Sequence, residues 1–242
     1  MATKQAGPGG IKLYYNMAGA YLPIGNTLTG YSIGPFAITG SVNETDCGIV
    51  TIAKSGGWAR LTGTNEDGYG IAVGTFPAFS PALNGTLVFE VRCELQVLTA
   101  RNIFVGFASA NALDVVEPLT ATGTTLTPVA ASYAGFMLDS QLTAAAYWHM
   151  PHNGGTTTGE VLSTDVVTDI CVAAATDILR VEIDPNGTAR WILNGDLKQT
   201  IEGAVSTTTL LAAFIGAFGT TTTIADVDVN YILFKANNDW TV

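Results

Sequence analysis

Apolar and polar residues alternate with a period of two along several segments of the chain. In residues 87–97 every odd-numbered position is apolar, and Glu90, Arg92 and Glu94 occupy even-numbered positions between them. Successive side chains of a β-strand point to opposite faces. The alternation therefore predicts a strand with one face in the core and the other in water.

The segment 178–193 repeats this pattern on both sides of a turn. Apolar and charged residues alternate up to Asp184, and Asp184-Pro185-Asn186-Gly187 has the composition of a tight turn. The returning strand places Trp191 in the core, and Asn194-Gly195 gives a hairpin signal. Residues 224–234 alternate in the same way and form the last predicted strand.

Two segments, 103–108 and 210–218, are apolar at nearly every position, which predicts central strands covered on both faces. Predicted strands recur every 8–15 residues with glycine-rich turns between them, and 170–176 is the one helix candidate. The sequence thus predicts an all-β antiparallel sandwich of the jelly-roll type.

Residues 1–40 contain clustered glycine and proline and lack the alternation, so we interpret them as an irregular, extended N-terminal arm. The arm would dock on the chain's own surface or on a neighbour, and residues 41–242 would form the sandwich domain. Aromatic side chains in the arm and near the C-terminus are the predicted interface residues: Tyr14, Tyr15, Tyr21, Tyr31 and Trp240.

Charge is scarce, at 12% of residues against about 25% in ordinary soluble proteins. A surface poor in charge is often covered, which favours a homo-oligomer, with a trimer preferred. The net charge of -10, without any cluster of lysine or arginine, argues against nucleic-acid binding. No apolar run approaches the ~18 residues of a membrane span, and the start resembles no signal peptide.

Several segments together resemble concanavalin A-like jelly rolls, which include lectins, glucanases and laminin-G-like modules. They are 68–75 (GYGIAVGT), 87–92 (LVFEVR), 102–108 (NIFVGFA), 179–184 (LRVEID) with Gly187 and Trp191, and 227–231 (VDVNY). The resemblance covers about residues 45–236, and it is a pattern of strands and turns.

More narrowly, the chain resembles versions of this fold in structural proteins of tailed bacteriophages. That resemblance implies a virion protein made in the host cytoplasm. It would act as a capsid decoration or cement protein that binds the major capsid protein and neighbouring subunits. The alternative is a carbohydrate-binding, lectin-like domain or a receptor-binding fibre domain that recognises surface glycans.

Glucanases of this fold carry a Glu-x-Asp-x-x-Glu strand motif. The nearest match here is Glu90, Arg92 and Glu94, in which an arginine replaces the middle acid and the spacing stays regular. We interpret the three as the salt-bridged wet face of a strand and predict a non-enzymatic protein. A glycoside hydrolase that uses Glu90 is the third hypothesis.

Candidate metal ligands are few. His149 and His152 are the only histidines, and two ligands do not complete a zinc site. Two acidic loops could offer oxygens to calcium, namely 43–46 with Asn43, Glu44 and Asp46, and 65–67 with Asn65, Glu66 and Asp67. We expect no cofactor and leave calcium open. Cys47, Cys93 and Cys171 are predicted to be buried free thiols.

Overall fold

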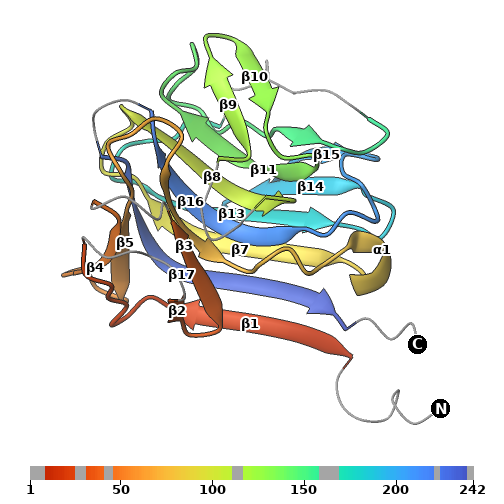
Figure 1. Cartoon of the computed structure of the whole chain (residues 1–242), viewed down its shortest axis with the longest axis horizontal. Coiled ribbons are helices and arrows are strands. Elements are labelled where there is room, and N and C mark those ends of the chain that lie inside the picture. The colour runs from red at the N-terminus through yellow and green to blue at the C-terminus, as the bar shows by residue number, and fades with distance from the viewer. Residues whose placement is uncertain are drawn as a thin grey trace.

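The computed structural model describes residues 9–24, 31–40, 46–110, 117–157, 169–220 and 224–238. Two antiparallel β-sheets pack face to face (Figure 1). The predicted antiparallel jelly-roll sandwich is confirmed.

Sheet A contains the strongly alternating strands. In spatial order it consists of β15 (Asp196–Ile201), β14 (Ala189–Leu193), β13 (Thr176–Ile183), β7 (Leu87–Glu94), β17 (Asp226–Asn237), β5 (Trp58–Thr62) and β4 (Gly48–Ile52). An eighth strand, β1 (Gly10–Asn16), pairs with the C-terminal half of β17. The burial of β13 alternates strictly along its length, as the sequence predicts for a strand with one wet face.

Sheet B contains the strands that are apolar at nearly every position. Its order is β12 (His152–Asn153), β11 (Tyr133–Asp139), β8 (Arg101–Ala108), β16 (Ala212–Gly219), β6 (Gly70–Gly74), β3 (Phe36–Gly40) and β2 (Ser32–Ile33). Every residue of β8, β11 and β16 is buried, so the prediction of strands covered on both faces is confirmed.

A second apolar layer covers the outer face of sheet B. Phe104, Met137 and Phe214 point outward from the sheet and pack in one cluster with Leu119 and Leu126. These two leucines belong to a separate hairpin made of β9 (Leu119–Thr122) and β10 (Thr125–Pro128). Figure 1 shows this hairpin above β8 and β11. The hairpin therefore closes the face that sheet B would otherwise present to solvent.

The prediction that residues 1–40 are irregular is wrong for three strands. Strand β1 joins sheet A, while β2 and β3 join sheet B, so the segment is extended and docks on the chain's own sheets. Backbone pairing with β17 and β6 supplies the order that the side-chain pattern did not reveal. The division of the chain into an arm and a domain at residue 40 stays a prediction.

The helix candidate at 170–176 is also wrong. Ile170 forms a β-bridge with Tyr147, and Ala174 has a positive φ of 61°, which no α-helix accommodates. In the described part of the chain the one helix is a single turn, α1 (Pro81–Asn84), which begins at a proline.

Candidate functional site

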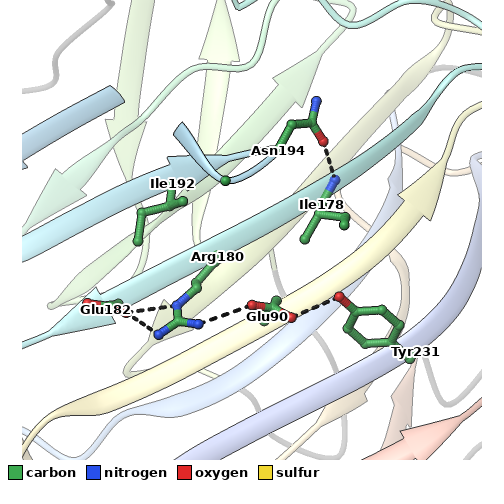
Figure 2. A pocket seen from close by; sticks show the side chains of 8 residues that line it. Glu90, Ile178, Arg180, Glu182, Ile192, Asn194 and Tyr231 are labelled. Carbon is green, nitrogen blue, oxygen red and sulfur yellow. Dashed lines mark hydrogen bonds and ion pairs between the residues drawn. The ribbon is translucent and has the colours of Figure 1, made fainter. Parts of the chain in front are cut away.

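The outer face of sheet A carries a hollow of about 450 Å³ above β7, β13, β14 and β17. Figure 2 shows Arg180 between two carboxylates, with Glu182 on one side and Glu90 on the other. Tyr231 lies beyond Glu90 in the same row. The rest of the lining is formed by Ile178, Ile192, Asn194 and Gly195.

Hydrogen bonds fix this row of polar side chains. The Nε atom of Arg180 donates to Oε1 of Glu182 at 2.7 Å, and its Nη1 lies 3.3 Å from Oε2 of Glu90. The hydroxyl of Tyr231 donates to Oε1 of Glu90 at 2.8 Å. Four side chains from three strands thus form one continuous network of donors and acceptors at the surface.

The network shifts two pKa values. Partial burial works to lower the pKa of Arg180, but the hydrogen bond to Glu182 and the charges of Glu182 and Glu90 outweigh it and raise that pKa above its ordinary value. Burial, and then the bond to Glu90, raise the pKa of the Tyr231 hydroxyl. Arg180 stays a cation and Tyr231 a neutral donor throughout the physiological pH range.

An aromatic pair borders the network. The ring of Tyr14, on β1, lies 5.9 Å from the ring of Tyr231, centroid to centroid, at an interplanar angle of 36°. Tyr14 is 52% exposed. The sequence singled out Tyr14 as an interface residue but gave no signal that β1 would place it beside Tyr231.

Glu90, Arg92 and Glu94, the nearest match to a glucanase motif, each bond a different partner. Glu94 is 6% exposed and pairs with Lys54, and it accepts a 3.0 Å hydrogen bond from Thr176. Burial works to raise the pKa of Glu94, but these bonds outweigh it and lower the pKa. Arg92 donates to Asn230 at 3.3 Å. The predicted salt bridges of β7 are present at Glu90 and Glu94, but Glu94 is buried rather than wet, and Arg92 bonds an amide rather than a carboxylate.

Further acidic side chains are salt-bridged as well. Asp184 pairs with Arg190, and Asp226 and Asp228 both pair with Arg60. Asp226 is also bound by the buried Arg101, with 2.6 Å between Nη1 and Oδ1.

A second polar cluster, which the sequence did not reveal, lies at one end of the outer face of sheet B. Asn102 of β8 and Asp139 of β11 are direct cross-strand partners. The Nδ2 atom of Asn102 donates to Oε2 of Glu117 at 2.7 Å. All three side chains are at least nine-tenths buried.

Burial changes the acidity of this cluster. It raises the pKa of Glu117 to about 8, and the charges of Asp139 and Asp67 add to the effect. It also raises the pKa of Asp139 to about 6, with a further contribution from Asp67. Residues 102, 117 and 139 are far apart in the sequence, so no local motif announced them.

The predicted calcium loops are placed only in part. Asn43 and Glu44 lie outside the described residues. In the second loop Asn65 and Glu66 are exposed, while Asp67 bridges to Gly219 and lies near the Glu117 cluster. Within the described ranges, no three His, Cys, Asp or Glu side chains are grouped so that they could hold a metal ion.

The histidines and cysteines lie inside the protein. His149 and His152 are each 1% exposed, and burial lowers the pKa of both. Both histidines are therefore interior residues of the sandwich. Cys47, Cys93 and Cys171 are buried free thiols, as predicted.

The remaining interface candidates differ in exposure. Tyr21 is 66% exposed and Tyr31 is 43% exposed, whereas Tyr15 is half-buried against the core. Trp240 lies outside the described residues. No helix in the described part of the chain is both long and apolar enough to cross a membrane.

No known protein family matches the chain, and no curated protein matches its sequence. Its fold is similar to that of many solved structures. A protein of unknown function, SO2946 from Shewanella oneidensis MR-1, has a TM-score of 0.58 and 11% identity, over 96% of this chain and 89% of that one.

Two further structures connect the fold with carbohydrate chemistry. The endo-1,3-β-glucanase from Streptomyces sioyaensis has a TM-score of 0.55 and 12% identity, over 96% of this chain and 99% of that one. The carbohydrate recognition domain of Emp47p has a TM-score of 0.51 and 9% identity, over 89% of this chain and 94% of that one. The concanavalin A-like part of the predicted resemblance is thereby confirmed.

One prediction is corrected by these similarities. The chain was expected not to be an enzyme, but the same sandwich is found in an endo-1,3-β-glucanase, so the architecture does not exclude hydrolysis. Neither glucanase nor lectin similarity points to a virion or a capsid. The homo-oligomeric state and the virion location stay predictions.

Proposed function

We propose that the chain is a lectin-like protein that binds carbohydrate on the outer face of sheet A. The observation that carries the proposal is the open hollow lined by Tyr231 and the Glu90–Arg180–Glu182 network, with the exposed Tyr14 ring packed against Tyr231 at its border. Apolar faces next to fixed polar groups are typical of small-molecule sites.

A sugar ring presents hydroxyl groups around its edge and C–H groups on its faces. Carboxylate oxygens of Glu90 and Glu182 can accept hydrogen bonds from hydroxyls, and Arg180 can donate to them, with the added strength of a charged partner. The exposed Tyr14 ring offers an apolar surface for C–H groups and keeps a polar tip in water. The hollow and the Tyr14 ring at its border therefore match both kinds of sugar surface.

Pre-organisation favours this face further. Arg180 is already held by two carboxylates, and Glu90 is held by Tyr231, so few side-chain rotations are lost when a ligand binds. The outer face of sheet B offers no comparable surface, because the β9–β10 hairpin and its apolar cluster cover it.

The similar structures support the same proposal. One is a carbohydrate recognition domain and another is an endo-1,3-β-glucanase, so domains of this shape act on carbohydrate in other proteins. A receptor-binding fibre domain would use a glycan-binding face in the same way. The capsid-decoration role has no comparable support in the geometry of this face.

Glycan-array screening of the full chain, followed by titration calorimetry, tests the proposal. We expect binding to at least one oligosaccharide class, weakened at least tenfold by Tyr14→Ala. Tyr21→Ala is the matched control, because Tyr21 is also exposed but lies beside β4, three positions from β7 in the sheet order. Absence of binding to every glycan, or equal loss in both variants, would contradict the proposal.

The open question of calcium is answered by the same titration. Binding that is lost in EDTA and restored by added Ca²⁺ would assign a calcium-dependent lectin. Binding unchanged in EDTA would assign recognition to the protein groups of sheet A alone.

A further inference from the structure

The strand register of sheet A places six outward-facing residues in a single row that crosses the strands. Each is the direct partner of the next on the neighbouring strand, from β1 to β15: Tyr14, Leu233, Glu90, Arg180, Ile192 and Leu197. Neighbouring strands lie about 4.8 Å apart, so the row is roughly 24 Å long. It extends beyond the hollow at both ends.

The two ends of the row are apolar and accessible. Tyr14 is 52% exposed at the β1 end, and Leu197 is 59% exposed at the β15 end. Leu233 and Ile192 are partly exposed just inside these ends. Glu90 and Arg180 occupy the centre. The row thus has two apolar ends and a hydrogen-bonding centre between them.

The rows on either side of this row are mainly polar. One neighbouring row, read through the same register, contains Lys12, Lys235, Val88, Glu182, Arg190 and Thr200. On the other side, Tyr231, Arg92 and Ile178 are successive partners, and the backbone N–H of Ile178 donates a 2.8 Å hydrogen bond to Oδ1 of Asn194. A ligand in the central row would have hydrogen-bonding groups along both of its edges.

Charge indicates the class of ligand. Arg180, at the centre of the row, is already neutralised by Glu90 and Glu182, and Arg190, in the neighbouring row, pairs with Asp184. The whole chain has a net charge of -10. A polyanionic chain would be repelled at long range by this net charge, and the guanidinium in the row itself is already paired; the cations Lys12, Lys235 and Arg92 lie in the flanking rows, to either side of that centre.

We propose that this row binds an extended, neutral oligosaccharide that crosses the strands from Tyr14 to Leu197. The inference rests on the proposed function, and it adds the direction, the length and the charge class of the ligand. Tyr14 and Leu197 form the two end subsites, and the Glu90–Arg180 pair binds hydroxyls at the centre.

Titration calorimetry with β-1,3-linked and β-1,4-linked gluco-oligosaccharides, from disaccharide to hexasaccharide, tests the inference. We expect affinity to rise about tenfold from the shortest to the longest chain of the series that binds. Leu197→Ala should remove most of that gain and leave disaccharide affinity unchanged. Leu210→Ala is the matched control, since Leu210 is also about half exposed but precedes β16 in sheet B.

The outcomes separate the inference from the proposed function. Equal affinity for short and long chains, with Tyr14→Ala weakening both, would overturn the row and leave carbohydrate binding intact. An oligouronide that binds tighter than the neutral chain of the same length would overturn the charge class. A loss in Leu197→Ala that is equal for all lengths would overturn the end subsite, and no binding to either series would overturn both proposals.

Discussion

The indole Nε1 of Trp191, in β14 of sheet A, donates a 2.8 Å hydrogen bond to the backbone carbonyl of Gly135, in β11 of sheet B. Both groups are buried. The bond spans the core and joins strands 56 residues apart in the sequence. It ties the hairpin that carries Arg180 and Ile192 to the rigid, doubly covered sheet.

Trp191→Phe is expected to destabilise the protein by about 2–4 kcal/mol, because a buried carbonyl loses its donor and the smaller ring leaves a cavity. Chemical denaturation monitored by circular dichroism measures the change. Trp58→Phe is the control: the Trp58 indole also donates to a carbonyl, that of Ser55, but only three residues away and within one turn. Equal losses in the two variants would show that the cross-sheet bond has no special weight.

Glu117 is expected to make stability depend on pH. Its pKa is raised from 4.5 to about 8 in the folded protein, so the folded state keeps a proton that the unfolded state releases. Its contribution is fully present below 4.5 and is lost as the pH rises through about 8. At about 1.4 kcal/mol per pKa unit, the loss amounts to roughly 3–5 kcal/mol. Asp139, raised to about 6, acts in the same direction.

Thermal unfolding measured across this pH range checks the prediction. Glu117→Gln should flatten the decline and raise the melting temperature at the alkaline end, because a neutral amide fills the site without an ionisation cost. Glu66→Gln, at an exposed position, should leave the curve unchanged. A wild-type curve that stays flat up to the alkaline end would refute the role of Glu117.

Packing of Leu126 is expected to anchor the β9–β10 hairpin on the outer face of sheet B. This side chain is 3% exposed and packs in the apolar cluster on the outer face of sheet B. Leu126→Ala should cost about 2–4 kcal/mol and increase the binding of a hydrophobic dye to the newly accessible face. Val129→Ala, at a position that is 48% exposed, should change neither measurement appreciably. A stable Leu126→Ala variant without added dye binding would contradict the covering role.

The alternating pattern predicted the strands of sheet A well, because β7, β13 and β17 each bury one face, and the apolar residues of their sequences fall on that face. The arm was mistaken for irregular chain because the alternation in β1 is short and its inward side chains, Ile11, Leu13 and Tyr15, are only partly buried against the core. The same pattern also predicted that Glu90 lies on a solvent-facing, salt-bridged face.

The composition of the candidate site could not be predicted in the same way. Tyr14, Glu90, Arg180 and Tyr231 come from four strands, and only the order β13-β7-β17 with β1 on β17 brings them together. Strand order in a sandwich depends on long-range pairing, which local periodicity does not encode. The buried cluster of Asn102, Glu117 and Asp139 was missed for the same reason.

Variants of Arg180 can separate the contribution of its geometry to glycan binding from the contribution of its charge. Its planar guanidinium bonds Glu182 through Nε and reaches Glu90 through Nη1, a fork that a lysine ammonium cannot reproduce. Arg180→Met should abolish detectable glycan binding, and Arg180→Lys should weaken it about tenfold, as measured by calorimetry. Since the side chain is 32% exposed, stability should fall by only about 1 kcal/mol in either variant.

Arg60→Lys is the matched control, because Arg60 forms a similar fork with Asp228 on β17, outside the hollow. Full binding by Arg180→Lys would mean that positive charge alone suffices, and unchanged binding by Arg180→Met would remove the network from the site altogether.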